Sequence, residues 1–415
     1  MTGPNIAAVR PAYRDGNVLR WLAAYTASVT GDVVYFLALS WSATRIAGPS
    51  QAGLVVAAGA LPRAVFMLAG GVVADRFGPR RVAAASDATR CLVILASAAA
   101  LVWAAPGIWL LVPLALLFGV VDAVFMPAVG AFPPRITTRE QLVRVQGMRG
   151  LSIRLSNSVG PAVGGMALAT GGAAGAFAVA GVLFAVSLVL LLTVRVAPAS
   201  APESSEHPNP WRELADGLRY VRRHRILAPL AGVIGLSEMC FSGPVALGLV
   251  LLADERGWGA AGTGWMASAF SIGAAVAALW ITVLPRITHA GPGVIAALLV
   301  TATATTVLGY TPSLLTATAL TVMIGLASGT TVTLTSALVQ AEADPDYLGR
   351  VTSLTTLCTL GLAPALFPIA GVSAQIWGAA TFFTGCGMIS LLAAALAVAV
   401  PALRHARLQS RGAQS

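Results

Sequence analysis

The chain contains twelve apolar runs, each long enough to cross a bilayer as a helix, and these runs constrain its fold more than any other feature. A membrane-spanning helix needs about 20 predominantly apolar residues. The runs cover residues 17–41, 50–74, 82–105, 107–132, 142–169, 173–195, 226–252, 261–284, 291–310, 313–340, 347–371 and 376–400. Because 57% of the residues are hydrophobic and only 10% are charged, a soluble fold could not cover its surface. The sequence therefore predicts an all-α integral membrane protein with twelve transmembrane helices.

The placement of arginine predicts the orientation in the membrane. All 26 basic residues are arginines. Odd-numbered connectors hold only Arg45 and Arg256, and Arg63 and Arg90 lie inside runs; the remaining arginines lie in the termini, in the even-numbered connectors or at adjoining helix ends. Since arginine-rich loops stay in the cytoplasm, we expect a multi-pass protein of the cell (cytoplasmic) membrane with both termini cytoplasmic. The net charge of +10 is then a topology signal, and no nucleic-acid partner is expected.

Residue types that are missing or scattered argue against several functional classes. A chain without lysine has no Walker-A lysine and no Schiff-base lysine. The four cysteines are isolated inside apolar runs, and the four histidines lie in polar connectors, so neither a metal site nor a cofactor is expected. The sequence shows no polar catalytic cluster and no coupling helix for an ATPase. We therefore expect neither an enzyme nor a pump subunit.

The runs form two sets of six on either side of a polar segment. Gly160-Pro161 in the fifth run is echoed by Ala363-Pro364 in the eleventh, an offset of about 205 residues. This repeat favours two pseudo-symmetric six-helix bundles around a central cavity. We expect an N-terminal bundle (1–196), a cytoplasmic linker (197–225) and a C-terminal bundle (226–415).

The linker changes character along its length. It begins rich in proline and serine, which suits a flexible tether. Trp211, Leu214, Leu218 and Val221 then recur at helical spacing, with arginines on the other face. This pattern predicts an amphipathic helix on the inner leaflet surface, in preference to a plain solvated linker.

A compact pattern of glycine, aspartate and arginine follows the second run. Gly78 allows the chain to reverse between adjacent helices, and Gly71 allows close helix approach. Asp75 can accept hydrogen bonds from a facing helix N-terminus, and the arginines can bridge to carboxylates or to lipid phosphates. The pattern comprises Gly71, Asp75, Arg76, Gly78, Arg80 and Arg81.

A second distinctive stretch lies in the fifth run. It reads Ser156-Asn-Ser-Val-Gly160-Pro161-Ala-Val-Gly164-Gly165. Pro161 removes a helix hydrogen bond, and the glycines let a neighbouring backbone approach. Helix packing by itself would also explain these small residues.

Both patterns resemble signatures of the major facilitator superfamily. The loop resembles G-x-L-A-D-R-x-G-R-[KR], with Val73 and Pro79 as departures, and the resemblance implies that Asp75 and its arginines latch the two halves in the outward-facing state. The fifth-run stretch resembles the antiporter motif G-x-x-x-G-P-x-x-G-G, with Ser156 in place of the first glycine. The chain is thus similar to the twelve-helix drug:proton antiporters, which include macrolide and siderophore efflux proteins.

Five ionisable residues lie deep inside the apolar runs. Counted from the cytoplasmic helix ends, Asp32 and Glu238 lie ~18 Å deep. Arg63, Arg90 and Asp122 lie ~12–17 Å deep in a hydrocarbon core ~30 Å thick. Charged groups at such depth are expensive, so they are functional candidates by default.

Asp32 and Glu238 occupy equivalent runs and would place one carboxylate in each bundle. Burial favours the protonated carboxyl, and a nearby arginine favours the charged form. A carboxyl group that is exposed alternately to each side of the membrane and to Arg63 can therefore bind and release a proton. We predict that Asp32 or Glu238 is the proton carrier.

The remaining deep charges are predicted to support this exchange. Asp122 is interpreted as a structural or gating partner of Arg90 or Arg63. Asp87, near the start of the third run, is interpreted as an interfacial helix-start residue or a loop latch. Static buried ion pairs that set helix register are the alternative for each of these residues.

Aromatic and methionine side chains at similar depth are candidates for lining the cavity. Such side chains suit bulky, amphipathic or cationic compounds, although lipid-facing and packing positions explain each of them equally well. The candidates are Tyr25, Tyr35, Phe36, Phe125, Met126, Phe241, Trp265 and Phe270.

Taken together, the residues and the resemblance indicate a secondary active transporter. We expect it to export lipophilic or amphipathic small molecules, such as an antibiotic, a drug or a siderophore-like compound, by proton-coupled alternating access. The expected partners are the small-molecule substrate, protons and membrane lipid, the energy source is the proton gradient, and the chain is expected to act as a monomer. A nutrient symporter or facilitator and a lipid flippase on the same fold are the alternatives.

Overall fold

Every segment that the computed structural model describes is helical or connects helices. The structure describes residues 12–103, 107–138, 141–196, 218–243, 247–283, 290–344, 347 and 365–406, and their side chains except those of residues 68, 69, 75, 143, 240, 242, 243, 282 and 283. No strand occurs within these ranges. The all-helical fold expected from the apolar runs is confirmed.

Single glycines and prolines separate the helices of the N-terminal half. Gly48 and Gly78 adopt φ values of 82° and 85°, and Pro49 and Pro79 begin the next helices, a position that favours proline. Non-helical backbone at Gly172 (φ 61°) divides the longest helix in two, so this helix contains the fifth and sixth runs. The elements are η1 (Ala12–Arg14), α1 (Gly16–Ala47), α2 (Pro49–Phe77), α3 (Pro79–Trp103), α4 (Ile108–Gly130), α5 (Pro133–Ile136) and α6 (Leu142–Thr193).

The C-terminal half has the same helical character. Its elements are α8 (Leu227–Gly243), α9 (Leu249–Glu255), α10 (Gly259–Val283), α11 (Ala290–Tyr310), α12 (Leu314–Glu342), the helix Ala365–Trp377, α14 (Ala379–Ala399) and α15 (Pro401–Arg404). Within the described ranges, nine helices are long and apolar enough to cross a membrane, and two shorter apolar helices lie in the seventh and eleventh runs. Because α6 holds two runs, all twelve runs contain helix. The part of the eleventh run from residue 348 to residue 364 lies outside the described residues.

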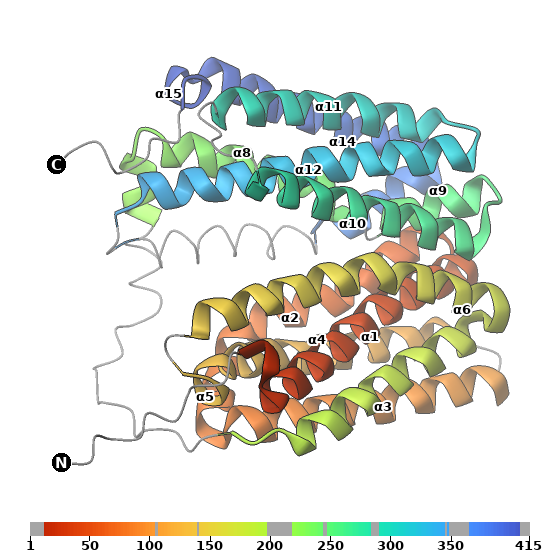
Figure 1. Ribbon diagram of the computed structural model, residues 1–415. Helices are drawn as coiled ribbons and strands as arrows, with labels where there is room; N and C mark the ends of the chain where they lie inside the picture. Colours follow the sequence, from red (N-terminus) through yellow and green to blue (C-terminus); the bar gives the residue numbers. More distant parts are fainter. Residues whose placement is uncertain are drawn as a thin grey trace, which may run out of the picture.

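The helices form two bundles, with α1–α6 in one and α8–α15 in the other (Figure 1). Residues 218–225, α5 and α15 lie at one end of the molecule, which we call the linker side. The α1–α2 and α9–α10 turns lie at the opposite end, which we call the far side.

Helix packing supports the internal repeat. A Cβ atom on Gly70 of α2 would lie 2.2 Å from the carbonyl oxygen of Ala123 on α4. In the other bundle, a Cβ atom on Gly329 of α12 would lie 2.5 Å from the carbonyl oxygen of Ala274 on α10. Gly70 corresponds to Ala274, and Ala123 corresponds to Gly329, each at an offset of about 205 residues. Both bundles thus contain the same close helix crossing, which only a residue without a side chain permits.

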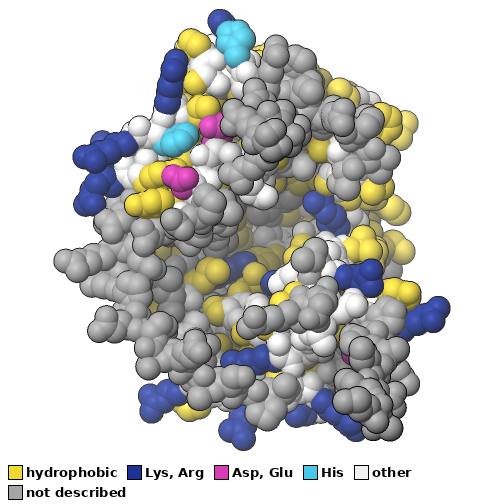
Figure 2. Space-filling view, turned by 60° about the vertical axis from the view of Figure 1, so that its left-hand side comes forward, with side chains coloured by type: hydrophobic (Ala, Val, Ile, Leu, Met, Phe, Trp, Pro, Cys, Tyr) yellow, Lys and Arg dark blue, Asp and Glu magenta, His cyan; other side chains and the backbone are white. Residues whose placement is uncertain are grey.

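The buried apolar side chains show where the bundles meet. At the far side, one continuous core contains side chains of both bundles, such as Phe184 and Phe383. At the linker side, each bundle has a core of its own, one around Trp21 and the other around Leu338. Among the described residues, the bundles are therefore joined at the far side and separated at the linker side. Figure 2 shows the resulting hollow, with hydrophobic and arginine side chains on its walls.

Polar contacts between the bundles follow the same asymmetry. The Arg45 guanidinium lies 3.1 Å from the Asp254 carboxylate. The backbone N–H of Ser50 donates to Oε1 of Gln375 at 3.3 Å. Both contacts join described residues of the two halves, so they close the molecule at the far side.

A side chain at Gly264 is expected to weaken the far-side closure. Its Cβ atom would lie 2.4 Å from the carbonyl oxygen of Pro161 on the other bundle, and overpacking of this kind costs about 1–3 kcal/mol. Gly264→Val should therefore increase the rate at which an impermeant maleimide modifies a cysteine introduced at Ser50. Gly385→Val, where a Cβ atom would meet nothing within 4 Å, is the control. Equal rates in the two variants would contradict the expectation.

Candidate functional site

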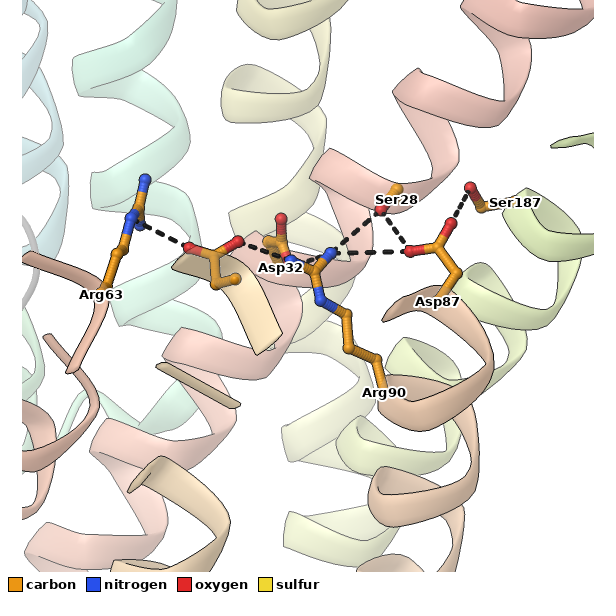
Figure 3. Close-up of polar contacts among 7 residues, drawn as sticks. Ser28, Asp32, Arg63, Asp87, Arg90 and Ser187 are labelled. Atoms are coloured by element: carbon orange, nitrogen blue, oxygen red, sulfur yellow. Dashed lines mark hydrogen bonds and ion pairs between the residues drawn. The ribbon is translucent and has the colours of Figure 1, made fainter. Parts of the chain in front are cut away.

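A buried arginine organises a polar cluster in the middle of the N-terminal bundle. Arg90 of α3 has a fully buried side chain. Its Nη2 lies 2.6 Å from Oδ1 of Asp122 on α4, and its Nη1 lies 3.4 Å from Oδ1 of Asp32 on α1. Nη1 also lies 3.6 Å from Asp87, one turn earlier on α3 (Figure 3). One guanidinium thus faces three carboxylates from three helices.

Asp87 is held firmly in place. Its Oδ1 accepts a hydrogen bond from Ser28 of α1 at 3.0 Å, and its Oδ2 accepts one from Ser187 of α6. Ser28 also accepts a hydrogen bond from Arg90 at 3.3 Å. With both carboxylate oxygens hydrogen-bonded and its side chain fully buried, Asp87 serves as a fixed counter-charge that ties α3 to α1 and α6.

Aromatic rings surround the guanidinium and exclude water from it. The guanidinium carbon of Arg90 lies 4.0 Å from the ring centroid of Phe125, 5.2 Å from that of Phe118 and 5.5 Å from that of Phe184. Cation–π contacts of this kind stabilise a desolvated cation. In such surroundings charge interactions are stronger than in water, so the carboxylates are needed to balance the charge.

Arg63 extends the cluster to a partly exposed side chain on α2. Its Nε lies 2.9 Å from Oδ2 of Asp122, so Asp122 bridges the two arginines. The side chain of Arg63 is 27% exposed, whereas that of Asp122 is 3% exposed. Asp122 therefore pairs with both arginines that the sequence offered as its partners, and its gating role remains a prediction.

The cluster has one carboxylate more than it has guanidinium groups. Three aspartates share Arg63 and Arg90, so a fully ionised cluster carries a net negative charge. Asp32 is the least tightly held of the three, because its buried Oδ1 makes no hydrogen bond and its side chain is 17% exposed. Of the three aspartates, Asp32 is therefore the one that best fits the predicted role of proton carrier, which remains a prediction.

Glu238 lies apart from this cluster, on α8 of the other bundle. Its side chain is half-buried and forms no ion pair or hydrogen bond within the described part of the chain. The two predicted proton carriers therefore occupy different surroundings. Asp32 points toward Arg90 inside its own bundle (Figure 3), whereas Glu238 has no cationic partner among the described residues.

The aromatic candidates divide into buried and accessible side chains. Three of them pack inside the N-terminal bundle: Tyr25 stacks on Trp21, Tyr35 stacks on Phe118 at 3.7 Å, and Phe125 lies against Arg90. Phe241 is also buried. In this conformation these side chains form core contacts and no open lining, and their contact with cargo remains a prediction.

The other four candidates keep some exposure. Phe36, Met126 and Phe270 are half-buried against core side chains. Trp265 is 54% exposed and lies on α10 along the same face as the exposed Ile272. Among the described residues, no group of three or more His, Cys, Asp or Glu side chains is arranged to hold a metal ion.

Sequence reasoning misplaced Asp87. The third run was expected to begin at residue 82, which put Asp87 near the membrane surface, but α3 begins at Pro79 and buries Asp87 completely. The i, i+3 spacing of Asp87 and Arg90 and the i, i+4 spacing of Ser28 and Asp32 were the available signals. They do not reveal that the two helices turn these faces toward each other.

Comparison with known proteins decides the family. Residues 21–368 match the family model described as Major Facilitator Superfamily. The chain belongs to the major facilitator superfamily. It is therefore a membrane transporter and not an enzyme, and the predicted superfamily fold is confirmed.

Relatives and solved structures agree with this membership. The multidrug efflux pump Tap of Mycolicibacterium fortuitum is 27% identical over 427 residues, which cover 95% of this chain and 98% of Tap. The enterobactin exporter EntS of Escherichia coli O1:K1 / APEC is 25% identical over 341 residues, covering 79% and 80%. A bacterial homolog of the human lysosomal transporter Spinster, in an inward-facing and occupied conformation, superposes with a TM-score of 0.72 at 14% identity, covering 94% and 98%. This last likeness concerns the fold alone.

The superfamily signature loop connects α2 and α3 on the linker side. Gly78 makes the turn, and Arg80 of α3 donates to the backbone oxygen of Leu192 on α6. The Arg76 guanidinium lies 5.7 Å from the ring centroid of Phe77. These contacts stay within the N-terminal bundle. Cβ atoms on Gly71 and Gly78 would meet nothing within 4 Å.

The roles predicted for Asp75 and Arg81 in this loop remain predictions. The side chain of Asp75 lies outside the described residues. For Arg81, which is exposed, no contact is described. The latch that the resemblance implies belongs to the outward-facing state, and this structure is open on the linker side.

The antiporter-like stretch of α6 packs against both bundles. Cβ atoms on Gly160 and Gly164 would contact Val33 and Leu37 of α1 at 2.8 and 3.1 Å. One on Gly165 would lie 2.9 Å from the carbonyl oxygen of Ala260 on α10 of the other bundle. The carbonyl oxygen of Pro161 lies against Gly264 of the same helix, α10.

At the beginning of this stretch, Ser156 hydrogen-bonds to α1. Its hydroxyl donates to the carbonyl oxygen of Thr26 at 3.1 Å and lies 3.0 Å from the hydroxyl of Thr30, which donates to it. The small residues of α6 therefore place its backbone between α1 and the opposite bundle.

Removal of the central arginine is expected to destabilise the transporter strongly. Arg90→Gln leaves buried carboxylates without their counter-charge, a change that costs about 3–5 kcal/mol. Thermal unfolding in detergent should show a much lower midpoint. Arg45→Gln, which removes an arginine with a 64% exposed side chain, should cost no more than about 1 kcal/mol. Similar midpoints for the two variants would contradict a central role for Arg90.

Proposed function

We propose that this transporter exports lipophilic or amphipathic small molecules in exchange for protons. The observation that carries the proposal is the surplus carboxylate of the Arg90 cluster, which provides a proton-binding group in the middle of a membrane-spanning bundle. The direction of transport is inferred from the relatives named as a multidrug efflux pump and an enterobactin exporter.

The mechanism follows from the asymmetry of the cluster. Asp87 stays charged because three polar groups hold it, so a proton that enters the cluster is taken up at Asp32. A protonated Asp32 no longer attracts Arg90, which then pairs more strongly with Asp122. Since Asp122 also holds Arg63 of α2, a proton at Asp32 changes the forces between α1, α2, α3 and α4.

Alternating access would couple this change to cargo. With the linker side open to the cytoplasm, Asp32 releases its proton inward, and the cargo enters the hollow between the bundles. After the bundles rock, the cargo leaves outward and Asp32 takes up an external proton. Glu238 lies in the opposite bundle and is the second candidate for proton binding.

The orientation is part of this proposal. The arginine-rich connectors and the signature loop lie on the linker side, so the positive-inside rule assigns this side to the cytoplasm. The hollow in Figure 2 is then inward-facing. Apolar side chains on its walls suit a cargo with a large hydrophobic surface.

Loss of the surplus carboxylate is expected to uncouple transport from the proton gradient. In proteoliposomes with an imposed pH gradient, Asp32→Asn should reduce cargo transport to the level of empty vesicles, because the cluster can no longer exchange a proton. Glu238→Gln tests the second candidate, and Asp344→Asn, an exposed acid on the linker side, is the control. Gradient-driven transport that survives in both Asp32→Asn and Glu238→Gln would refute the assignment.

Expression of the gene in an efflux-deficient host should reveal the cargo class. We expect a higher inhibitory concentration for at least one lipophilic antibiotic or dye, and no increase with Asp32→Asn. A panel of chemically diverse compounds provides the measurement, and membrane abundance of both forms provides the control. Unchanged susceptibility to every compound would favour a nutrient or lipid cargo on the same fold.

A further inference from the structure

The end of the linker carries a concentration of positive charge that the transport mechanism does not use. Residues 218–225 contain four arginines directly before α8. Arg222, Arg223 and Arg225 are exposed and form no ion pair with a described carboxylate. Figure 2 shows arginine side chains gathered on the outer edge of the upper bundle.

This segment is fixed to the C-terminal bundle, and Val221, which was expected on the leaflet surface, faces the core of that bundle instead. Val221 is only 4% exposed and belongs to the core around Leu338. The ring of Tyr220 stacks on that of Tyr347 at 4.3 Å with an interplanar angle of 8°. Its hydroxyl accepts a hydrogen bond from the backbone N–H of Asp344 at 3.2 Å. The segment is therefore a rigid platform; Trp211 and Leu214 lie outside the described residues.

The platform contains a pocket of about 440 Å³ with a basic and aromatic lining. Arg219 and Arg223 are four residues apart on the helix face opposite the buried Val221. The pocket is lined by Arg219, Tyr220, Arg223, His224 and Tyr347.

His224 adds a hydrogen-bond donor to this pocket. Its Nδ1 accepts from the backbone N–H groups of Ile226 and Leu227 at 3.3 and 3.2 Å. In the neutral ring the hydrogen is therefore on Nε2, which remains available as a donor. The pocket thus combines the exposed guanidinium of Arg223 with an imidazole N–H, two kinds of donor that match the oxygens of a phosphate.

We propose that this pocket binds the phosphate of an anionic phospholipid headgroup. A lipid is the favoured source of the phosphate because Leu218, directly before Arg219, is 43% exposed and can contact an acyl chain. Tyrosines are also typical of the membrane interface. The bound lipid would join the linker segment to Tyr347 and so hold it against the C-terminal bundle.

The experiment compares two arginines of the same helix in the full-length protein. Arg223 lines the pocket and Arg222 does not, although both are exposed and carry the same charge. Short-chain phosphatidylglycerol is titrated into detergent-purified protein, and binding is followed by thermophoresis. Because an arginine near a lipid headgroup contributes about 1 kcal/mol, Arg223→Gln should raise the Kd about fivefold or more.

The control variants separate a site from general attraction. Arg222→Gln should change the Kd by less than about twofold, since it removes only screened, long-range attraction. Arg223→Lys should retain part of the affinity, because the charge remains while the planar fork is lost. Elution of all variants at the wild-type volume in size exclusion verifies their folding.

Weaker binding in Arg223→Gln alone supports the site. Equal weakening in Arg222→Gln and Arg223→Gln would overturn it in favour of diffuse attraction by the arginines. Equal affinity for inorganic phosphate, or for short-chain phosphatidylcholine, would overturn the assignment to an anionic lipid headgroup. None of these measurements depends on proton coupling, so the site can fail while the proposed function holds.

Discussion

The N-terminal bundle is organised around one cation that has no access to water. A guanidinium enclosed by three phenylalanine rings is stable only when carboxylates balance its charge, and Arg90 obtains them from α1, α3 and α4. This requirement fixes how these three helices turn relative to one another. It also supports the proposed proton coupling, because three carboxylates around two arginines leave one carboxylate that is not needed to pair either arginine.

The second constraint is the uneven packing between the bundles. A shared core and backbone contacts such as that of Gly264 with Pro161 join the two halves at the far side, and separate cores keep them apart at the linker side. Small residues permit this arrangement because they provide contact without interlocked side chains. Such a contact can act as a pivot. Pro161 lies on α6 of the N-terminal bundle. The polar cluster lies in the same bundle, and two of its helices, α1 and α3, form hydrogen bonds with α6.

Part of this architecture was predictable from the sequence. Apolar runs of sufficient length specify transmembrane helices whatever their neighbours are, because unpaired backbone groups are not tolerated in lipid. Deep charges such as Asp32, Arg90 and Asp122 were identifiable for the same reason, since their rarity in apolar runs marks them. Asp87 was misjudged because its burial depends on how α1 and α6 pack against α3, which the sequence of α3 does not show.

Amino-acid order by itself determined that the chain forms membrane-spanning helices, and it predicted the two-fold repeat and the side of the membrane on which positive charge gathers, because hydropathy and arginine placement act locally along the chain. Only the tertiary structure decided which charges meet. Helix rotation is set by packing between segments far apart in sequence, and that packing turned Asp32 toward Arg90 and left Glu238 without a cationic partner among the described residues. The same packing buried Val221 against the bundle, so that the arginines of the linker face outward.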